Sequence, residues 1–117
     1  MSYILLIIEP TGQRSTRTEV EGREVYARMQ RFGEALKEEG KLKAVESLAS
    51  QREAVRVSSR GGKAQLLDGP FAEAKEMIGG FFLLDGVSRD EALAIAQRCP
   101  AAEWATVEVR ALAPCFL

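Results

Sequence analysis

Histidine is absent from the sequence, and cysteine occurs only twice. Without imidazole, a zinc site or a haem site is not expected, because histidine is a frequent ligand of both. The two cysteines, Cys99 and Cys115, fit neither a metal motif nor a disulfide framework. Cys99 continues the apolar stripe of a predicted helix, so we interpret it as a small buried hydrophobe. Carboxylates alone could bind Mg²⁺ or Ca²⁺, but no motif indicates a metal or a cofactor, and we expect neither.

Long apolar runs and an excess of one charge are also lacking. The longest apolar run, Ile4–Ile8, is far shorter than the ~20 residues of a membrane-spanning helix. No basic leader or cleavage site accompanies it, so no signal peptide is expected. Sixteen basic and seventeen acidic residues give a net charge of -1, without the basic excess typical of nucleic-acid-binding domains. We therefore expect a cytoplasmic protein that binds neither membrane nor nucleic acid.

The length of 117 residues, with 46% hydrophobic and 28% charged residues, is typical of one globular domain over residues 1–117. The short apolar run Tyr3–Glu9, which ends at Pro10, predicts a strand buried on both faces. Apolar residues at helical spacing predict a helix over Glu21–Glu39, with Gly40 in the position of a C-cap glycine.

The middle of the chain contains several shorter patterns. Lys41–Ala49 is a weaker alternating strand, and two short runs around Gly61 and Gly62 predict a hairpin. The apolar run Met77–Gly86 predicts another strand without clean alternation.

The last third predicts a helix and a strand. Ser88 and Glu91 have the spacing of a capping box at a helix start, and Pro100 ends that helix. Thr106–Ala111 alternates between apolar and polar residues, which predicts a strand with one face in water.

The order of the predicted elements is strand, helix, strand, hairpin, strand, helix, strand. Without the hairpin this is βαββαβ, the ferredoxin-like α+β arrangement. Its first and third main strands lie at the centre of the sheet, and these are the strands that lack alternation here. Helices cover one face only, so apolar groups on the other face need a second cover. We therefore predict a homodimer in which sheet faces sheet.

The stretch DGPFAEAKEMIGGFFLLD resembles the signature of the YCII-related proteins, in the branch called DGPF-domain proteins. YILLI resembles the opening strand of that family, DEALAIAQRCP its second helix and TVEVR its closing strand, so the resemblance covers essentially the whole chain. It implies a dimeric α+β barrel, built from two ferredoxin-like sheets with an inserted β-hairpin. Ala74 stands where many relatives have a hydroxyl residue. Some relatives resemble enzymes with a histidine–aspartate pair, which cannot operate in this chain without histidine.

A structural explanation of this motif is available. Asp68 and Gly69 would end a hairpin strand, and one of the two would cap a short helical turn that starts at Pro70. Phe71 would then fill the core. Gly79 and Gly80, at the start of a strand, indicate a β-bulge or close backbone packing.

The charged residues of the motif support a functional interpretation instead. We take Asp68 as a candidate catalytic acid or base, because a carboxylate partly buried near aromatic side chains can exchange protons at neutral pH. Lys75 is the candidate charge stabiliser, because an ammonium group can polarise a carbonyl oxygen. The candidate ligand-binding residues are Phe71, Glu73, Glu76 and Phe82.

Together these observations predict a protein that binds a small, partly apolar, oxygenated compound in a dimeric barrel cavity. The resemblance implies cofactor-free isomerisation, elimination or dehalogenation if the protein is an enzyme. The alternative is a non-catalytic regulatory partner, because DGPF-type genes are often found beside alternative sigma factors. A cavity lined by phenylalanine and carboxylates favours the first function, and a flat charged surface over a filled interior favours the second.

Overall fold

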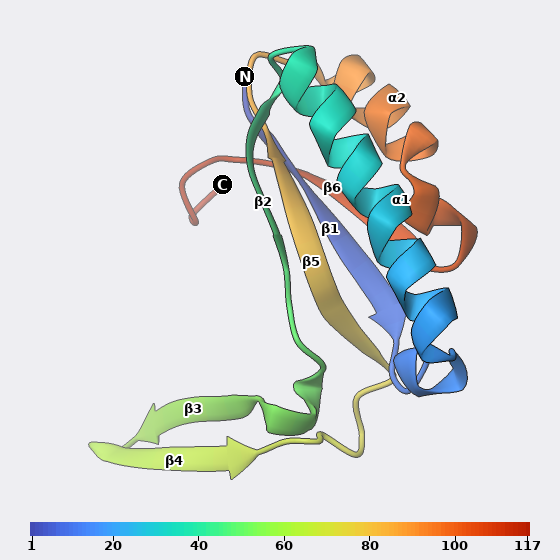
Figure 1. The fold of residues 1–117 in the computed structure, drawn as a ribbon. Helices are drawn as coiled ribbons and strands as arrows, with labels where there is room; N and C mark the ends of the chain where they lie inside the picture. Colours follow the sequence, from blue (N-terminus) through green and yellow to red (C-terminus); the bar gives the residue numbers. More distant parts are fainter.

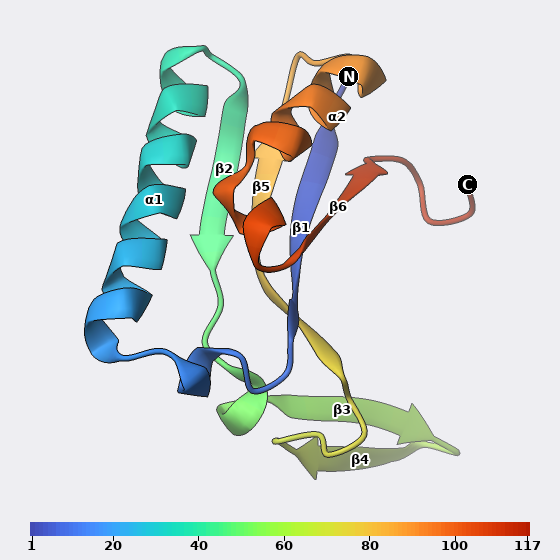
Figure 2. The ribbon, with the colours of Figure 1, turned by 90° about the vertical axis from the view of Figure 1, so that its right-hand side faces the viewer.

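The computed structural model describes residues 1–117 as an α+β fold with two layers (Figure 1). The main sheet has four strands, β1 (Tyr3–Pro10), β2 (Leu42–Ser47), β5 (Glu76–Leu84) and β6 (Thr106–Ala111). Their order is β2-β5-β1-β6, and all neighbours are antiparallel. The helices α1 (Glu19–Glu38) and α2 (Arg89–Arg98) both lie on one face of this sheet (Figure 2). This arrangement is compatible with the predicted ferredoxin-like fold.

A separate two-stranded sheet lies between β2 and β5 in the chain. It consists of β3 (Val55–Arg60) and β4 (Lys63–Asp68), which pair antiparallel. We call residues 55–68 the arm, because they project away from the main sheet (Figure 1). Gly61 and Gly62 form its two-residue turn with φ angles of 58° and 79°, a backbone conformation that glycine adopts without steric cost.

Three short 3₁₀ helices complete the chain: η1 (Arg14–Thr16), η2 (Gln51–Glu53) and η3 (Pro100–Glu103). η1 connects β1 to α1, and η2 leads from β2 into the arm. No helix is long and apolar enough to span a membrane.

The side chains that cap the starts of α1 and α2 differ from the prediction, which placed a capping box at α2. Thr18 and Glu21 form a complete capping box on α1, and the hydrogen bonds from Thr18 lower the pKa of Glu21. In the predicted capping box at α2, Ser88 does accept a hydrogen bond from the backbone N–H of Glu91. The Glu91 carboxylate, however, pairs with Lys41 Nζ at 2.8 Å. Glu91 thus joins the start of α2 to the start of β2 and does not close the box.

The core lies between the helices and the sheet. Tyr3, Leu5 and Ile7 of β1 face the helices, and their buried neighbours include Phe82 of β5 and Ile95 of α2. Burial raises the pKa of the Cys99 thiol and confirms that this residue is a buried hydrophobe.

The opposite face of the sheet, which we call the open face, has no layer over it. Ile4, Leu6 and Ile8 of β1 alternate with the buried residues and are only half-buried. The prediction that β1 is buried on both faces is therefore not met within a single chain, because both helices pack on the same side. The radius of gyration is 16.0 Å, against about 13 Å for a compact domain of this length. The projecting arm and the single covering layer account for the difference.

Candidate functional site

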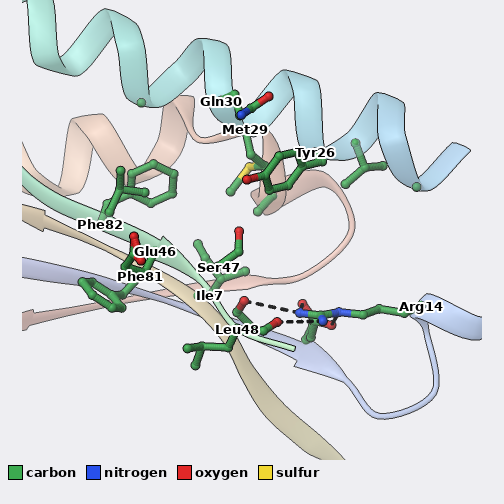
Figure 3. Close-up of a pocket in the computed structure, with 18 of the residues that line it drawn as sticks. Ile7, Arg14, Tyr26, Met29, Gln30, Glu46, Ser47, Leu48, Phe81 and Phe82 are labelled. Carbon is green, nitrogen blue, oxygen red and sulfur yellow. Dashed lines mark hydrogen bonds and ion pairs between the residues drawn. The ribbon is translucent and has the colours of Figure 1, made fainter. Parts of the chain in front are cut away.

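A cavity of about 1070 Å³ lies between α1 and the sheet (Figure 3). Apolar side chains from several elements line it, namely Tyr26, Met29, Val45, Phe82 and Trp104. Charged residues also line it, among them Glu9 near the end of β1 and Arg14 in η1. The cavity thus combines an apolar wall with charged groups, and polar groups in a small-molecule site fix the orientation of the ligand.

Glu9 and Arg14 form an ion pair. Arg14 Nε donates to Glu9 Oε1 at 2.6 Å, and Arg14 Nη2 donates to Glu9 Oε2 at 3.4 Å. Glu9 is the one buried charged residue of the chain, with 7% of its surface exposed. A carboxylate is rarely buried unless it is paired, so the pair explains how Glu9 can end a core strand.

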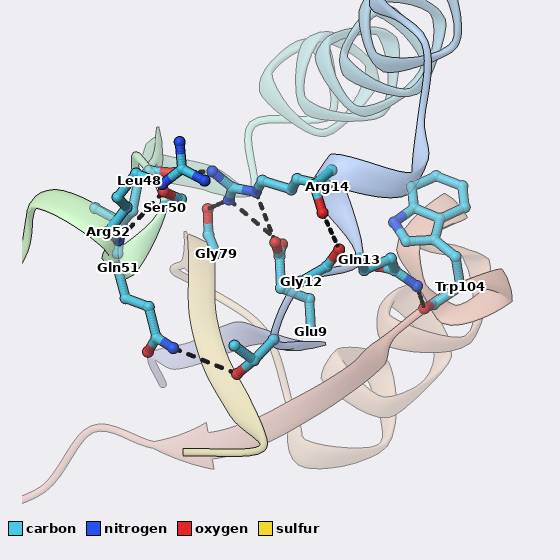
Figure 4. Close-up of polar contacts among 12 residues, drawn as sticks. Glu9, Gly12, Gln13, Arg14, Leu48, Ser50, Gln51, Arg52, Gly79 and Trp104 are labelled. Carbon is cyan, nitrogen blue, oxygen red and sulfur yellow. Dashed lines mark hydrogen bonds and ion pairs between the residues drawn. The ribbon is translucent and has the colours of Figure 1, made fainter. Parts of the chain in front are cut away.

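Backbone carbonyl groups hold the guanidinium of Arg14 in place (Figure 4). Nη1 donates to the Leu48 carbonyl oxygen at 2.8 Å, and Nη2 donates to the Gly79 carbonyl oxygen at 3.3 Å. Arg14 therefore connects the ends of β1, β2 and β5. A side chain fixed at this many points is pre-organised for binding, because it has little freedom left to lose.

The paired glycines of β5 make this arrangement possible. A Cβ atom at Gly79 would lie 2.0 Å from Glu9 Oε2 and 3.0 Å from Arg14 Nη2. A Cβ atom at Gly80 would lie 2.8 Å from the carbonyl oxygen of Glu46 on β2. The register of β1 and β5 also shifts at this point, between Ile7 and Ile8. The prediction of a bulge or close backbone packing at the glycines is confirmed.

The pair can still bind a ligand. A guanidinium has five N–H donors, and that of Arg14 makes four hydrogen bonds, which leaves one donor. The carboxylate of Glu9 accepts hydrogen bonds from Arg14 only, although its oxygens can accept about four. The site therefore offers one donor and several acceptor positions side by side.

Trp104 forms part of the cavity wall and is held by its neighbours. Its carbonyl oxygen accepts a hydrogen bond from Gln13 Nε2 at 2.7 Å. The guanidinium groups of Arg17 and Arg28 lie 5.8 Å and 5.3 Å from the centroid of its ring, within the range of a cation–π interaction. Because it is the only tryptophan of the chain, its fluorescence reports on this cavity.

Among the predicted site residues, Phe82 is the one that lines the cavity. Phe71 is buried, but beneath the arm, where the guanidinium of Arg56 lies 3.9 Å from the centroid of its ring. Glu76 is exposed at the start of β5 and lines a second cavity of about 840 Å³, which also involves Ile8 and Ile78.

The other charged residues of the motif are exposed. Asp68 ends β4, and Glu73 and Lys75 lie in the connection between β4 and β5. None of the three lines either of these two cavities. Their predicted roles remain predictions.

The predicted helical turn after Asp68 is wrong. The chain there makes a turn closed by the Ala74 N–H and the Phe71 carbonyl oxygen at 3.0 Å, with no helix. Gly69 has a packing role instead, because a Cβ atom there would lie 2.0 Å from the carbonyl oxygen of Gln51 in η2.

Sequence reasoning missed Glu9, Arg14 and Trp104. A signal for Glu9 was present, because it continues the alternation of Tyr3, Leu5 and Ile7 and so must lie on the helix-covered face of β1. A carboxylate on this buried face is costly unless a cation lies nearby to pair with it. No group of three or more carboxylate or cysteine side chains in the structure could hold a metal ion.

Two comparisons relate this chain to known proteins. The family described as the YCII-related domain matches residues 1–115. An uncharacterised protein from Rhizobium meliloti (strain 1021) is 34% identical over 115 residues, which are 97% of this chain and 93% of that protein.

Proposed function

The chain belongs to the YCII-related domain family, and from this premise we propose that it is a small-molecule-binding protein. Its ligand is a small, partly apolar, neutral compound with hydroxyl and carbonyl oxygens. The cavity between α1 and the sheet holds the ligand, and Glu9 and Arg14 bind its oxygens. The observation that carries this proposal is the ion pair between the buried Glu9 and the partly exposed Arg14, which lines a cavity with an apolar wall.

The neutrality of the ligand follows from the pair itself. Glu9 neutralises the charge of Arg14, so an anionic ligand would meet a buried carboxylate beside the guanidinium and be repelled by it. A hydroxyl can donate to Glu9, and a carbonyl oxygen can accept the remaining N–H of Arg14. Hydrogen bonds to charged groups are about twice as strong as those between neutral groups. Such a compound therefore satisfies both partners without breaking their ion pair.

The lining of this cavity by Phe82 and carboxylates supports ligand binding over the alternative of a regulatory partner with a filled interior. In this proposal the protein works in the cytoplasm and needs no cofactor. The acid–base role of Asp68 and the charge-stabilising role of Lys75 belong to a second hypothesis, in which a partner chain completes a site at the motif.

We propose further that two chains form a dimeric α+β barrel through their open faces. The half-buried Ile4, Leu6 and Ile8 and the exposed Ile78 support it, because they lie on a sheet face that no helix covers. Light scattering is expected to give twice the chain mass of 12.8 kDa at micromolar concentration. A well-folded monomer under those conditions would refute the dimer.

The ligand proposal is tested with a panel of compounds. Neutral hydroxy-carbonyl compounds are expected to raise the melting temperature by several degrees at 100 times their Kd, since binding then stabilises the folded state by about 2.7 kcal/mol. The same compounds are expected to change the fluorescence of Trp104. A panel in which only carboxylates or phosphates bind would contradict the proposal.

A further inference from the structure

The arm has an apolar face that its own chain leaves uncovered. Val57 and Leu66 are cross-strand partners, and Val55, two residues before Val57, lies on the same face. These side chains are exposed, with 69% of Val57 and 67% of Leu66 accessible to solvent. Apolar groups gathered on one face of a projecting element indicate an interaction surface.

The other face of the arm contacts its own chain at the base through Arg56, while Leu67 on that face is exposed. Arg56, which alternates with Val55 and Val57, stacks on Phe71 and lines the second cavity beside Ile78. At the base of the arm, the Gly69 N–H donates to the carbonyl oxygen of Ala54 at 2.7 Å. Beyond this base the arm is an isolated pair of strands, and such a pair is at best marginally stable in water.

We infer that the apolar face of the arm, formed by Val55, Val57 and Leu66, docks on a second copy of this chain. The inference rests on the proposed dimer and adds a second contact to it. The arm projects to the side of the open face and away from the helices (Figure 1). A partner seated on the open face would therefore lie beside the arm. In a two-fold dimer the contact occurs twice, since each arm reaches the other chain.

The distribution of charge favours a second copy as the occupant. The arm carries three basic residues, Arg56, Arg60 and Lys63, on the face opposite to Val57 and Leu66, and one acidic residue, Asp68, on the same face as these two. Its net charge of +2 in a chain of net charge -1 leaves -3 on the remainder. On the open face, Glu46 pairs with Phe81 and Glu108 pairs with Leu6, so acidic groups flank its apolar centre. Opposite charges on the arm and on the rest of the chain steer identical chains toward each other.

Two matched variants test this inference. Leu66→Glu places a carboxylate on the apolar face, and Gln65→Glu places the same charge on the adjacent residue of the opposite face. Because both residues are exposed, neither change is expected to unfold a single chain. Leu66→Glu is expected to weaken the dimer at least tenfold, because a leucine side chain is no longer buried. Gln65→Glu is expected to leave the dimer dissociation constant within about threefold, since a surface change of this kind has little effect.

The outcomes distinguish a failure of the proposed arm contact from a failure of the proposed dimer. A wild-type monomer would overturn the proposed dimer itself. A wild-type dimer that Leu66→Glu leaves equally tight would overturn the docking of the arm while the dimer stands. Amide hydrogen exchange gives a second measurement on the unmodified protein. We expect slow exchange for the paired amides of β3 and β4 in the dimer, and exchange at the rate of an unfolded chain would also overturn the inference.

Discussion

Replacing Gly79 with alanine is expected to lower the free energy of unfolding by about 1–3 kcal/mol and to abolish ligand binding. The added Cβ atom would lie 2.0 Å from Glu9 Oε2 and 2.7 Å from Glu9 Cδ, so the carboxylate must move. A displaced Glu9 no longer forms its two hydrogen bonds with Arg14. Urea denaturation measures the first effect, and Trp104 fluorescence measures the second.

Gly22→Ala is the matched control for this change. Gly22 lies in α1, lines the same cavity, and a Cβ atom there would have no neighbour within 4 Å. Alanine in a helix is favoured over glycine by about 1 kcal/mol, so the control should be as stable as the wild type or more stable. If Gly79→Ala had the urea midpoint of the wild type, the close packing against Glu9 would have no energetic role.

Replacing Arg14 with methionine is expected to have the second large effect. It leaves the carboxylate of Glu9 buried without its partner, and it frees two carbonyl groups, those of Leu48 and Gly79. Because Arg14 itself is 36% exposed, water can reach part of the site. We expect a loss of about 1–3 kcal/mol of stability and at least a tenfold loss of affinity for any compound that binds the wild type.

The double variant Glu9→Gln with Arg14→Met distinguishes charge from packing. It removes the buried charge that the single variant leaves unpaired, so it should be more stable than Arg14→Met alone. Affinity for the ligand should not return, because both binding groups are lost. A double variant as unstable as the sum of the two single changes would mean that the two residues act independently.

Most of the fold could be predicted from the sequence because local patterns and packing agree. The apolar residues of α1 repeat at helical spacing, and Gly40, with a φ of 72°, follows α1 where a C-cap glycine was predicted. The alternation of Thr106–Ala111 matches a strand with one half-buried face. The order of these elements allows few arrangements of an antiparallel sheet with two helices.

The candidate site could not be predicted because it depends on contacts between distant parts of the chain. Arg14 lies in a polar connection with no periodicity, and its acceptors at Leu48 and Gly79 are 34 and 65 residues away. The charged residues of the motif are close in sequence, but Glu73 and Lys75 lie exposed in the connection between β4 and β5. The glycines of the motif indicate the site better than its charged residues do, since Gly79 packs directly against the ion pair of Glu9 and Arg14.

The most direct measurement is a map of backbone and side-chain NMR shifts on addition of a compound that raises the melting temperature. If the ligand lies between α1 and the sheet, the largest changes should fall on the Gly79 amide, the Arg14 Nε–H and the indole N–H of Trp104, three groups at the cavity. Asp68→Asn should then bind the compound as well as the wild type. Changes confined to residues 68–76, with binding lost in Asp68→Asn, would contradict this account and place the site at the exposed motif.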